Sequence, residues 1–326
     1  MIKNYYDKTT LFIIFGVMKK YTFLILFFVI FSCKESEILN ENDSFVTDPP
    51  KNDINLMESL FKKFDGITTS NDTSFFYVNS NGLPGHSMMK GITNWQQQIP
   101  INQEYSGDNN WAIPISPTFS ETPLSTKANL MKGALAIAVN GVPIFNPLNN
   151  RGEDANLIGE LDQWGGHCGK ADDYHYHIPP THLTSEVGQN NPIAYALDGF
   201  PVYGKTTKSL DENLGILNDD GSYHYYTIDQ YPYFIANMKG NVKTSGTPPE
   251  NQINPQPSAK AIRQALQPIN GATIVDFTEI SSNSFRLKYT LNSEFYLIDY
   301  YWDSTGHYYL TFTDPNGTSR TETYHK

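Results

Sequence analysis

The feature that most constrains the fold of this chain is an internal duplication between residues 136 and 226. Residues 136–145 (AIAVNGVPIF) match residues 194–203 (AYALDGFPVY) at an offset of 58. Further along, LDQ at 161–163 matches LDE at 210–212, and YHYH at 174–177 matches YHYY at 223–226, both at an offset of 49. Because two separate segments share one offset, chance is a poor explanation, and each copy should fold as the same unit.

Each copy begins with the pattern of a strand, a tight turn and a second strand. Asn140-Gly141 and Asp198-Gly199 each follow an apolar run, and a proline stands two residues after each glycine. A tight hairpin turn needs positive φ angles, which these residue pairs tolerate. The duplicated region is therefore expected to be rich in β-strands.

The two copies differ at the positions where metal ligands would stand. At the offset of 49, His167 aligns with Ile216 and His177 aligns with Tyr226. Only the histidine at 175 is kept, as His224. If one copy carries a site, it is the first, and the second has kept the scaffold but lost the ligands.

A β-hairpin over residues 165–177 would gather the three histidines of the first copy. The loop GKADD at 169–173 consists of small and turn-favouring residues. If Cys168 pairs with Tyr174, His167 lies opposite His175, and glycine 165 lies opposite histidine 177 and clears room. Side chains alternate between the faces of a strand, so the three imidazoles should share one face, while Cys168 and the tyrosines take the other.

Three neutral imidazoles on a rigid hairpin suit a borderline metal such as zinc or copper. The sequence therefore predicts a metal site formed by His167, His175 and His177, with His86 as the first candidate for a fourth ligand. A register shift of one residue would instead turn Cys168 inward in place of His167 and give a Cys-His-His set. The weaker candidates for the shell are His182, His224, Asp198 and Cys168.

Two other functional hypotheses remain open beside a metal-binding protein for acquisition or storage. In one, the protein is a metal-dependent enzyme of the envelope, in which the ion activates water and Asp198 or His224 moves protons. In the other, the histidines only form hydrogen bonds, and a tyrosine-rich surface contacts a protein or a carbohydrate. Five of the eight histidines lie between positions 167 and 224, which favours metal binding. The sequence lacks the glycine-rich phosphate loop, the Gly-x-Ser-x-Gly elbow and the His-Glu-x-x-His motif of common kinases and hydrolases.

The N-terminus has the pattern of an export signal. Met18-Lys19-Lys20 precedes an apolar run at 21–31 that is too short to span a bilayer as a helix. Ile30-Phe31-Ser32-Cys33 resembles the lipobox of bacterial lipoproteins. We therefore expect residues 1–32 to be a signal peptide, with translation starting at Met18, and Cys33 to be acylated, which anchors the protein in the cell envelope at the outer membrane or the cell surface.

The charge of the chain excludes some partners. The formal net charge is −11, and removal of residues 1–32 takes away four lysines and one aspartate, which leaves −14 over 294 residues. An acidic chain is a poor binder of nucleic acid, and without a polybasic stretch the lipid is the expected membrane contact. With Cys33 acylated, Cys168 has no partner for an intramolecular disulfide.

Beyond the signal, composition divides the chain into three parts. Residues 33–55 are polar and acidic and are expected to form a flexible tether. Residues 56–250 should form a β-rich domain that starts with a short helix at 57–64. After a proline-rich linker at 246–257, residues 251–326 should form a small α+β domain, with a helix at 259–266 and an antiparallel meander of about four strands. The predicted class is mainly β or α+β.

These motifs resemble the YHYH protein family, which is named for the tetrapeptide found here at 174–177. Its other marks stand here as NGLPGH at 81–86, GGH at 165–167 and YALDGFPVYG at 195–204. The resemblance covers about residues 75–240 and implies an exported protein, but no particular activity. The second tetrapeptide departs from the family pattern, because it ends in Tyr226, and the cysteines that often flank it in relatives are absent. The segment from 251 onward lies outside the resemblance.

Overall fold

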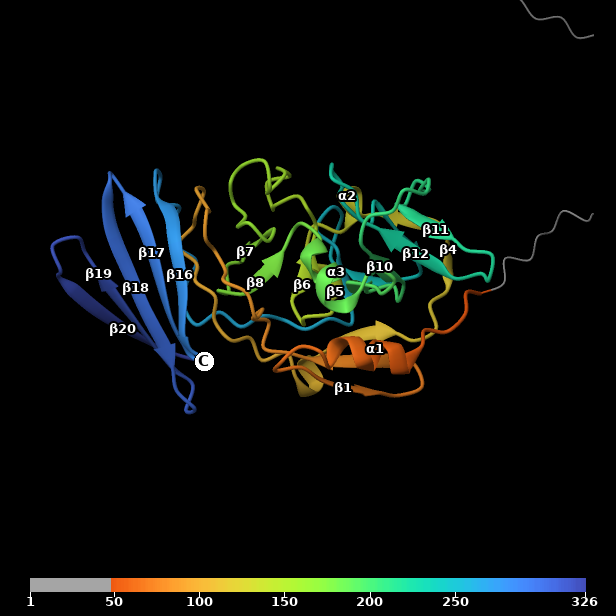
Figure 1. Cartoon of the computed structure of the whole chain (residues 1–326), viewed down its shortest axis with the longest axis horizontal. Coiled ribbons are helices and arrows are strands. Elements are labelled where there is room, and N and C mark those ends of the chain that lie inside the picture. Colours follow the sequence, from red (N-terminus) through yellow and green to blue (C-terminus); the bar gives the residue numbers. More distant parts are fainter. Residues whose placement is uncertain (1–47) are drawn as a thin grey trace, which may run out of the picture. The chain divides into compact units, whose positions relative to one another are not determined.

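The computed structural model describes residues 48–326, which lie within one compact unit, Val46–Lys326 (Figure 1). The predicted signal peptide, the lipidation at Cys33 and all but the end of the predicted tether lie outside the described residues. Within residues 48–326, no helix combines the length and the apolar character needed to cross a membrane.

The duplication builds an eight-stranded sheet at the centre of the unit (Figure 1). The strand order is β11-β12-β10-β9-β5-β6-β8-β7, so each copy contributes four neighbouring strands in the same order from the middle outward. The copies meet where β5 pairs antiparallel with β9, and there Ile137 faces Tyr195, its own counterpart in the alignment. Equivalent residues that pair with each other indicate an approximate two-fold axis perpendicular to the sheet. The strands are β5 (Ala134–Ala138), β6 (Pro143–Phe145), β7 (Gly166–Cys168), β8 (Tyr174–Tyr176), β9 (Ala194–Ala196), β10 (Pro201–Tyr203), β11 (Gly215–Leu217) and β12 (Tyr223–Tyr226).

The turns predicted in each copy are confirmed. Gly141 and Gly199 have φ angles of 75° and 98° and close the turns β5–β6 and β9–β10. A Cβ atom at Gly141 would lie 2.8 Å from the Cβ atom of Ser80, so space as well as conformation requires glycine there. The parallel strand pairs repeat too. β6 pairs with β8 through Ile144 and Tyr176, and β10 pairs with β12 through their counterparts Val202 and Tyr225.

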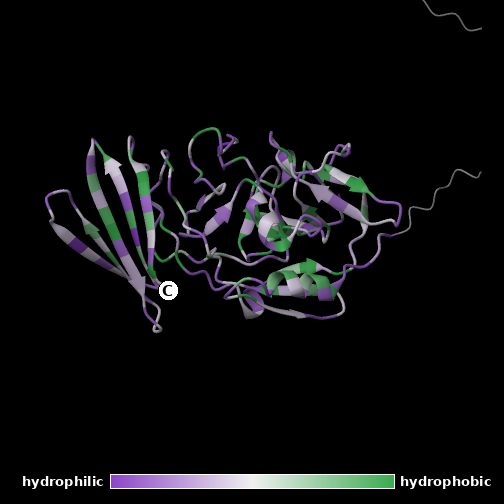
Figure 2. Cartoon of the chain, in the orientation of Figure 1, coloured by the Kyte–Doolittle hydropathy of each residue, from purple (hydrophilic) through white to green (hydrophobic). Residues whose placement is uncertain are grey.

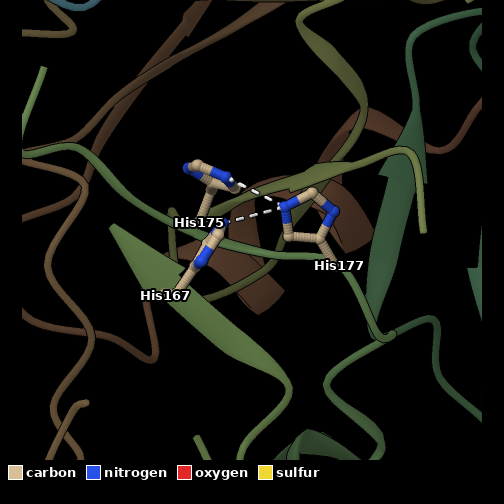
Figure 3. Close-up of side chains that lie close together, drawn as sticks. All are labelled: His167, His175 and His177. Carbon is tan, nitrogen blue, oxygen red and sulfur yellow. Dashed lines mark hydrogen bonds between the residues drawn. The ribbon is translucent and has the colours of Figure 1, made fainter. Parts of the chain in front are cut away.

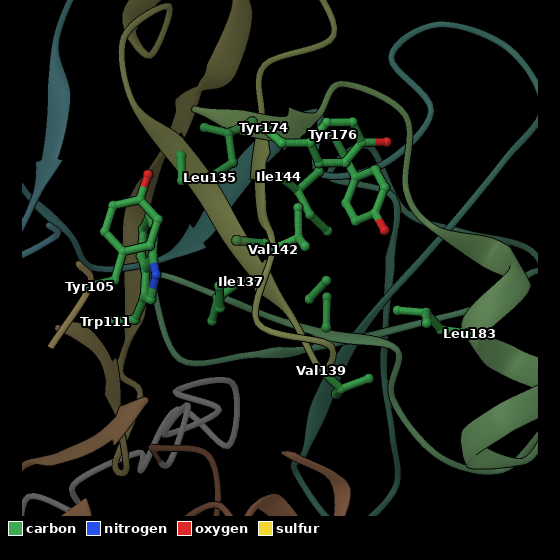
Figure 4. Close-up of a cluster of buried hydrophobic side chains, with 14 of the residues drawn as sticks. Tyr105, Trp111, Leu135, Ile137, Val139, Val142, Ile144, Tyr174, Tyr176 and Leu183 are labelled. Carbon is green, nitrogen blue, oxygen red and sulfur yellow. The ribbon is translucent and has the colours of Figure 1, made fainter. Parts of the chain in front are cut away.

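Buried side chains from β5, β6 and β8 form the core of the first copy (Figure 4). Ile137, Ile144 and Tyr176 are fully buried there. On the side of the second copy, helix α1 (Ile54–Phe61) stacks Phe61 on Tyr195 at 6.1 Å between ring centroids. The helix predicted at 57–64 therefore exists, but it begins and ends three residues earlier, because the preceding aspartate at 53 caps it by accepting two backbone N–H bonds.

Smaller elements complete this part of the chain. A three-stranded sheet has the order β1-β2-β3, β4 pairs with β13, and β14 pairs with β15. The predicted linker at 246–257 is therefore wrong in part, since β15 and the turn that joins it to β14 lie within it. The elements are β1 (Thr68–Asn71), β2 (Phe75–Asn79), η1 (Gly107–Asn109), β3 (Trp111–Pro114), β4 (Phe119–Ser125), α2 (Thr126–Asn129), η2 (Thr181–Leu183), α3 (Thr184–Val187), β13 (Asn237–Gly240), β14 (Lys243–Ser245) and β15 (Gln252–Asn254).

The C-terminal segment forms an antiparallel meander of five strands in chain order. Its first four strands alternate hydrophobic and hydrophilic residues, as Figure 2 shows, which is the pattern that predicted them. The fifth, β20, was missed because its side chains are mostly exposed and polar. The strands are β16 (Thr273–Ser281), β17 (Ser284–Leu291), β18 (Glu294–Trp302), β19 (His307–Thr313) and β20 (Ser319–His325).

The helix predicted at 259–266 is wrong, and residues 251–326 contain no helix. Arg263 reaches from this segment to Asp172 in the hairpin loop, with its Nε atom 2.8 Å from a carboxylate oxygen, and it donates a second bond to the carbonyl of Gln97. Both side chains of the ion pair are almost fully buried. Tertiary contacts of this strength outweigh the weak helix propensity of an eight-residue segment.

The meander shares its buried face with the rest of the unit. The N–H group of Ile274 donates to the carbonyl of Ile92, and the Tyr300 hydroxyl donates to the carbonyl of Pro100 at 2.8 Å. A single cluster of buried side chains includes residues of the duplicated sheet and of the meander. The loop at 88–103 thus connects the two sheets through hydrogen bonds as well as packing.

Candidate metal centre

The hairpin β7–β8 has the register that the sequence predicts. His167 pairs with His175, and Cys168 pairs with Tyr174. The N–H of Gly169 donates to the carbonyl of Asp173 at 2.9 Å and closes the loop. The alternative register, which would turn Cys168 toward the histidines, is therefore excluded.

The three histidines of the first copy point their Nε2 atoms at one another (Figure 3). The Nε2 atom of His177 lies 3.0 Å from that of His167 and 3.2 Å from that of His175. One potential ligand atom from each of the three residues lies within 4.8 Å of the others. A small ion at this point would touch all three imidazoles.

The opposite sides of two of the three rings are held by backbone carbonyl groups. The Nδ1 atom of His175 lies 2.9 Å from the carbonyl oxygen of Asp173, and that of His177 bonds to the carbonyl oxygen of Asn146. The Nε2 atom of His167 faces that of His177 at 3.0 Å. Since a carbonyl only accepts, the bonded ring nitrogens of His175 and His177 carry the proton, and each of these two neutral rings keeps a lone pair on the nitrogen that faces its neighbours.

Lone pairs facing one another repel unless a cation or a proton lies between them. Burial lowers the pKa of His177 to about 3, with the neighbouring imidazole of His175 adding to the shift. Burial also lowers the pKa of His167 well below its usual value. These rings therefore resist protonation at neutral pH and remain in the form that binds metals.

The neighbours of His175 fix its ring in this orientation. The ring of Phe145 stacks on it at 4.0 Å between centroids, and a carboxylate oxygen of Asp173 lies 3.4 Å from its Nδ1 atom. A Cβ atom at Gly169 would lie 2.9 Å from a carbon of the same ring. Gly165 has another role than the one predicted: its φ is 82°, and an added Cβ would meet Ile178 rather than a histidine.

Asp162 holds the base of the hairpin and was missed as a site residue. Its buried carboxylate accepts hydrogen bonds from the N–H groups of Met89, Trp164 and Gly166 and from the Tyr174 hydroxyl. Burial raises the pKa of this carboxyl despite the four donors. The duplication contained the signal, because Asp162 aligns with Asp211, which binds Tyr223 in the same way.

The histidines open onto a cavity of about 620 Å³. Its walls come from five separate parts of the chain, namely residues 89–98, 131–133, 145–151, the hairpin itself and 265–268, together with Glu160. The cavity is within the size range of small-molecule sites. A metal held by three imidazoles would thus have space beside it for water or another ligand.

The structure does not bring His86 or His182 to the three imidazoles. The Nε2 atom of His86 lies 2.7 Å from the hydroxyl of Tyr176, whose side chain points to the other face of β8. The ring of His86 stacks on Trp164, and His182 lies beside both rings. His86 therefore supports the tyrosine face of the hairpin.

His224 and Asp198 belong to the second copy. His224 stacks on Tyr203 at 4.7 Å, as its counterpart His175 stacks on Phe145, and it pairs with Ile216. Asp198 accepts hydrogen bonds from the Tyr225 hydroxyl at 2.6 Å and from a backbone N–H. The scaffold of the site is thus repeated without its ligands.

Cys168 also lies apart from the imidazoles. Its buried Sγ atom is 3.5 Å from the sulfur of Met89. Burial raises the pKa of the Cys168 thiol well above its usual value, which disfavours the thiolate that metals bind.

The pair His86 and His182 predicts an acid-sensitive fold. Burial lowers the pKa of each from 6.5 to about 4. Between pH 6.5 and 4 the unfolded chain therefore takes up protons that the folded chain refuses, so stability falls as the pH drops through this range and levels off below it. In metal-free protein, urea denaturation at pH 7 and pH 5 should show that the wild type loses about 1 kcal/mol more than His86→Gln/His182→Gln, after allowance for solvent screening. Equal losses would contradict the assignment.

Comparison with known proteins matches most of the duplicated region to a described family. Residues 110–218, about a third of the chain, match the family described as YHYH protein. The match contains the three convergent histidines and both copies of the first hairpin. No curated protein and no solved structure matches the chain. The chain therefore carries a domain of the YHYH protein family.

Proposed function

We propose that this protein is a cell-envelope lipoprotein whose YHYH domain binds a transition metal ion, copper or zinc, through His167, His175 and His177. The observation that carries the proposal is the convergence of three imidazole Nε2 atoms on one point. The role of the protein would be the acquisition or storage of the metal.

The chemistry of the donor set supports this choice of metals. Imidazole nitrogen suits both zinc and copper, and no thiolate or carboxylate ligand atom joins the three nitrogens among the described residues. Carbonyl groups on the far side of the His175 and His177 rings orient these two ligands, as they do in established metal sites. The rings of His175 and His177 are buried, so an ion there would interact strongly with them.

The location in the cell envelope rests on the sequence. A charged start, a short apolar run and a lipobox precede Cys33, and a polar segment follows it. The variant Cys33→Ser should leave the membrane fraction, since one lipid-bearing residue is the proposed anchor. If the variant stayed in the membrane fraction as fully as the wild type, the lipid anchor would be wrong.

Metal uptake tests the central claim directly. Protein purified without a polyhistidine tag is reconstituted with Zn²⁺ or Cu²⁺ and dialysed, and we expect about one equivalent to remain bound. The control variant His224→Ala should retain as much metal as the wild type. His224 is the counterpart of His175, but it lies in the second copy, which lacks the other two histidines. Uptake below about 0.1 equivalent with Zn²⁺ and also with Cu²⁺ would overturn the proposal.

The second copy offers a gain-of-function prediction. Ile216→His together with Tyr226→His restores the missing ligands around His224 on a hairpin of the same register. Metal uptake should rise from about one to about two equivalents, with the new site the weaker because its surroundings were not selected to orient the rings. Isothermal titration with Zn²⁺ measures the number of sites and the affinity of each. An unchanged stoichiometry in folded protein would show that register alone does not make a site.

A metal-dependent envelope enzyme is the second candidate, and the cavity beside the histidines favours it. The proton-transfer role predicted for Asp198 or His224 has no support in their positions, because both lie in the second copy and do not line this cavity. Glu160 lines it, but its carboxylate is held by Arg151 at 2.6 Å.

A further inference from the structure

The cavity beside the histidines carries an excess of positive charge. Three cationic side chains line it, those of Lys132, Arg151 and Lys170, against the two carboxylates of Glu160 and Asp173. This contrasts with the protein as a whole, which has a formal net charge of −11.

Both carboxylates of the cavity already have partners. Glu160 is almost fully buried and accepts bonds from Arg151 at 2.6 Å and from the side-chain amide of Asn149 at 3.2 Å. Asp173 accepts a backbone N–H bond from Ala171 and lies 3.4 Å from a ring nitrogen of histidine 175. Neither carboxylate forms an ion pair with Lys132 or Lys170.

The two lysines of the cavity have no such partner. Among residues 48–326, no carboxylate forms an ion pair with Lys132 or Lys170. Lys132 stands on the segment after α2, and Lys170 stands in the hairpin loop, so they approach the cavity from two different elements. A metal ion on the three imidazoles would add further positive charge to the same space.

Another part of the cavity wall is apolar. Met89, Ile92, Trp95 and Leu148 line it, and all four are buried. The indole N–H of Trp95 donates to the carbonyl of Gln98 at 2.7 Å, so this ring presents carbon rather than a donor. A ligand that fits here has an acidic end and an apolar body.

We propose that the cavity binds a small organic anion, whose acidic oxygen completes the coordination of the metal and whose charge is met by Lys132 and Lys170. The inference rests on the proposed metal centre and names the class of ligand that would share it. Carboxylates and phosphonates have this chemistry in common, and both are good ligands for zinc. A neutral sugar would leave the two lysines without a counter-charge.

Titration calorimetry on the zinc-loaded full-length protein tests the inference with four probes. Benzoate and phenylphosphonate carry an acidic group on an apolar ring, benzamide has the same shape without the charge, and methyl glucoside represents a neutral sugar. We expect at least one of the two anions to bind at least about tenfold more tightly than benzamide and methyl glucoside. The ranking of the two anions identifies the acidic group that the site prefers.

A pair of charge-matched variants isolates the lysines. Lys132→Gln/Lys170→Gln should weaken anion binding about tenfold, while the affinity for zinc stays within about twofold, because neither lysine is a metal ligand. Lys63→Gln/Lys243→Gln removes the same charge from exposed positions that do not line the cavity, and it should bind the anion as the wild type does.

The outcomes separate this inference from the metal centre itself. If zinc binds but neither anion does, or if benzamide or methyl glucoside binds as tightly as the anions, the ligand class is wrong and the metal centre stands. Unchanged anion binding in Lys132→Gln/Lys170→Gln also overturns the inference. If neither zinc nor copper binds to the wild type, the metal centre and this inference fall together, and if copper alone binds, the same four probes are titrated into the copper-loaded protein.

Discussion

Replacing His177 by alanine is expected to abolish metal-dependent stabilisation of this protein. His177 lies between the other two rings, with its Nε2 atom 3.0 and 3.2 Å from theirs. A ligand that binds only the folded state stabilises it by about 2.7 kcal/mol at a concentration of 100 times its dissociation constant. Thermal unfolding with and without Zn²⁺ should therefore show a clear shift for the wild type and almost none for His177→Ala, with a loss of affinity of at least about 100-fold.

In the metal-free protein the same substitution should be far less harmful than the burial of His177 suggests. Removal of the ring leaves a cavity, but it also relieves the repulsion between facing lone pairs, so the two effects oppose each other. His86→Ala is the control on the opposite face of the hairpin, and its zinc affinity should stay within about threefold of the wild type. A zinc-induced shift that survives in folded His177→Ala would contradict the proposed centre.

The largest loss of stability is expected from Asp162→Ala. The carboxylate is buried and accepts four hydrogen bonds, three from the hairpin and the residues before it and one from Met89 in the loop at 88–103. Its removal leaves these donors without partners inside the protein, which costs about 3 kcal/mol or more. Urea denaturation measures the loss, and zinc affinity should fall with it, because this aspartate holds the strand that carries His167.

Asp211→Ala is the matched substitution in the second copy. Asp211 accepts a similar set of bonds, from two backbone N–H groups and the Tyr223 hydroxyl, but it is exposed to solvent. Water can replace the lost bonds there, so the cost should be about 1 kcal/mol and zinc affinity should not change. Equal destabilisation by both substitutions would show that burial does not set the difference.

Much of the first copy could be predicted because its information is local. The alternation of side chains along a hairpin and a five-residue loop are enough to place His167, His175 and His177 on one face. The duplication added independent support, since the second copy repeats the same pairing with Ile216 and His224. The family resemblance agreed with the strand periodicity and with the duplication.

The errors lie where distant contacts decide the structure. The segment 259–266 has the composition of a helix, yet Arg263 binds Asp172, 91 residues away in the chain. His86 looked like a fourth ligand because it is a histidine in a family motif, but Tyr176 holds it on the far side of β8. Neither contact has a signature in the local pattern.

The sequence by itself therefore determined which side chains share a face of the hairpin, because that property follows from strand periodicity and loop length alone. The tertiary structure decided that their Nε2 atoms converge, since the carbonyl group that fixes the central ring, that of His177, belongs to Asn146 on a different segment. It also decided that the histidines face a cavity lined by lysines, because those walls meet only when remote parts of the chain pack together.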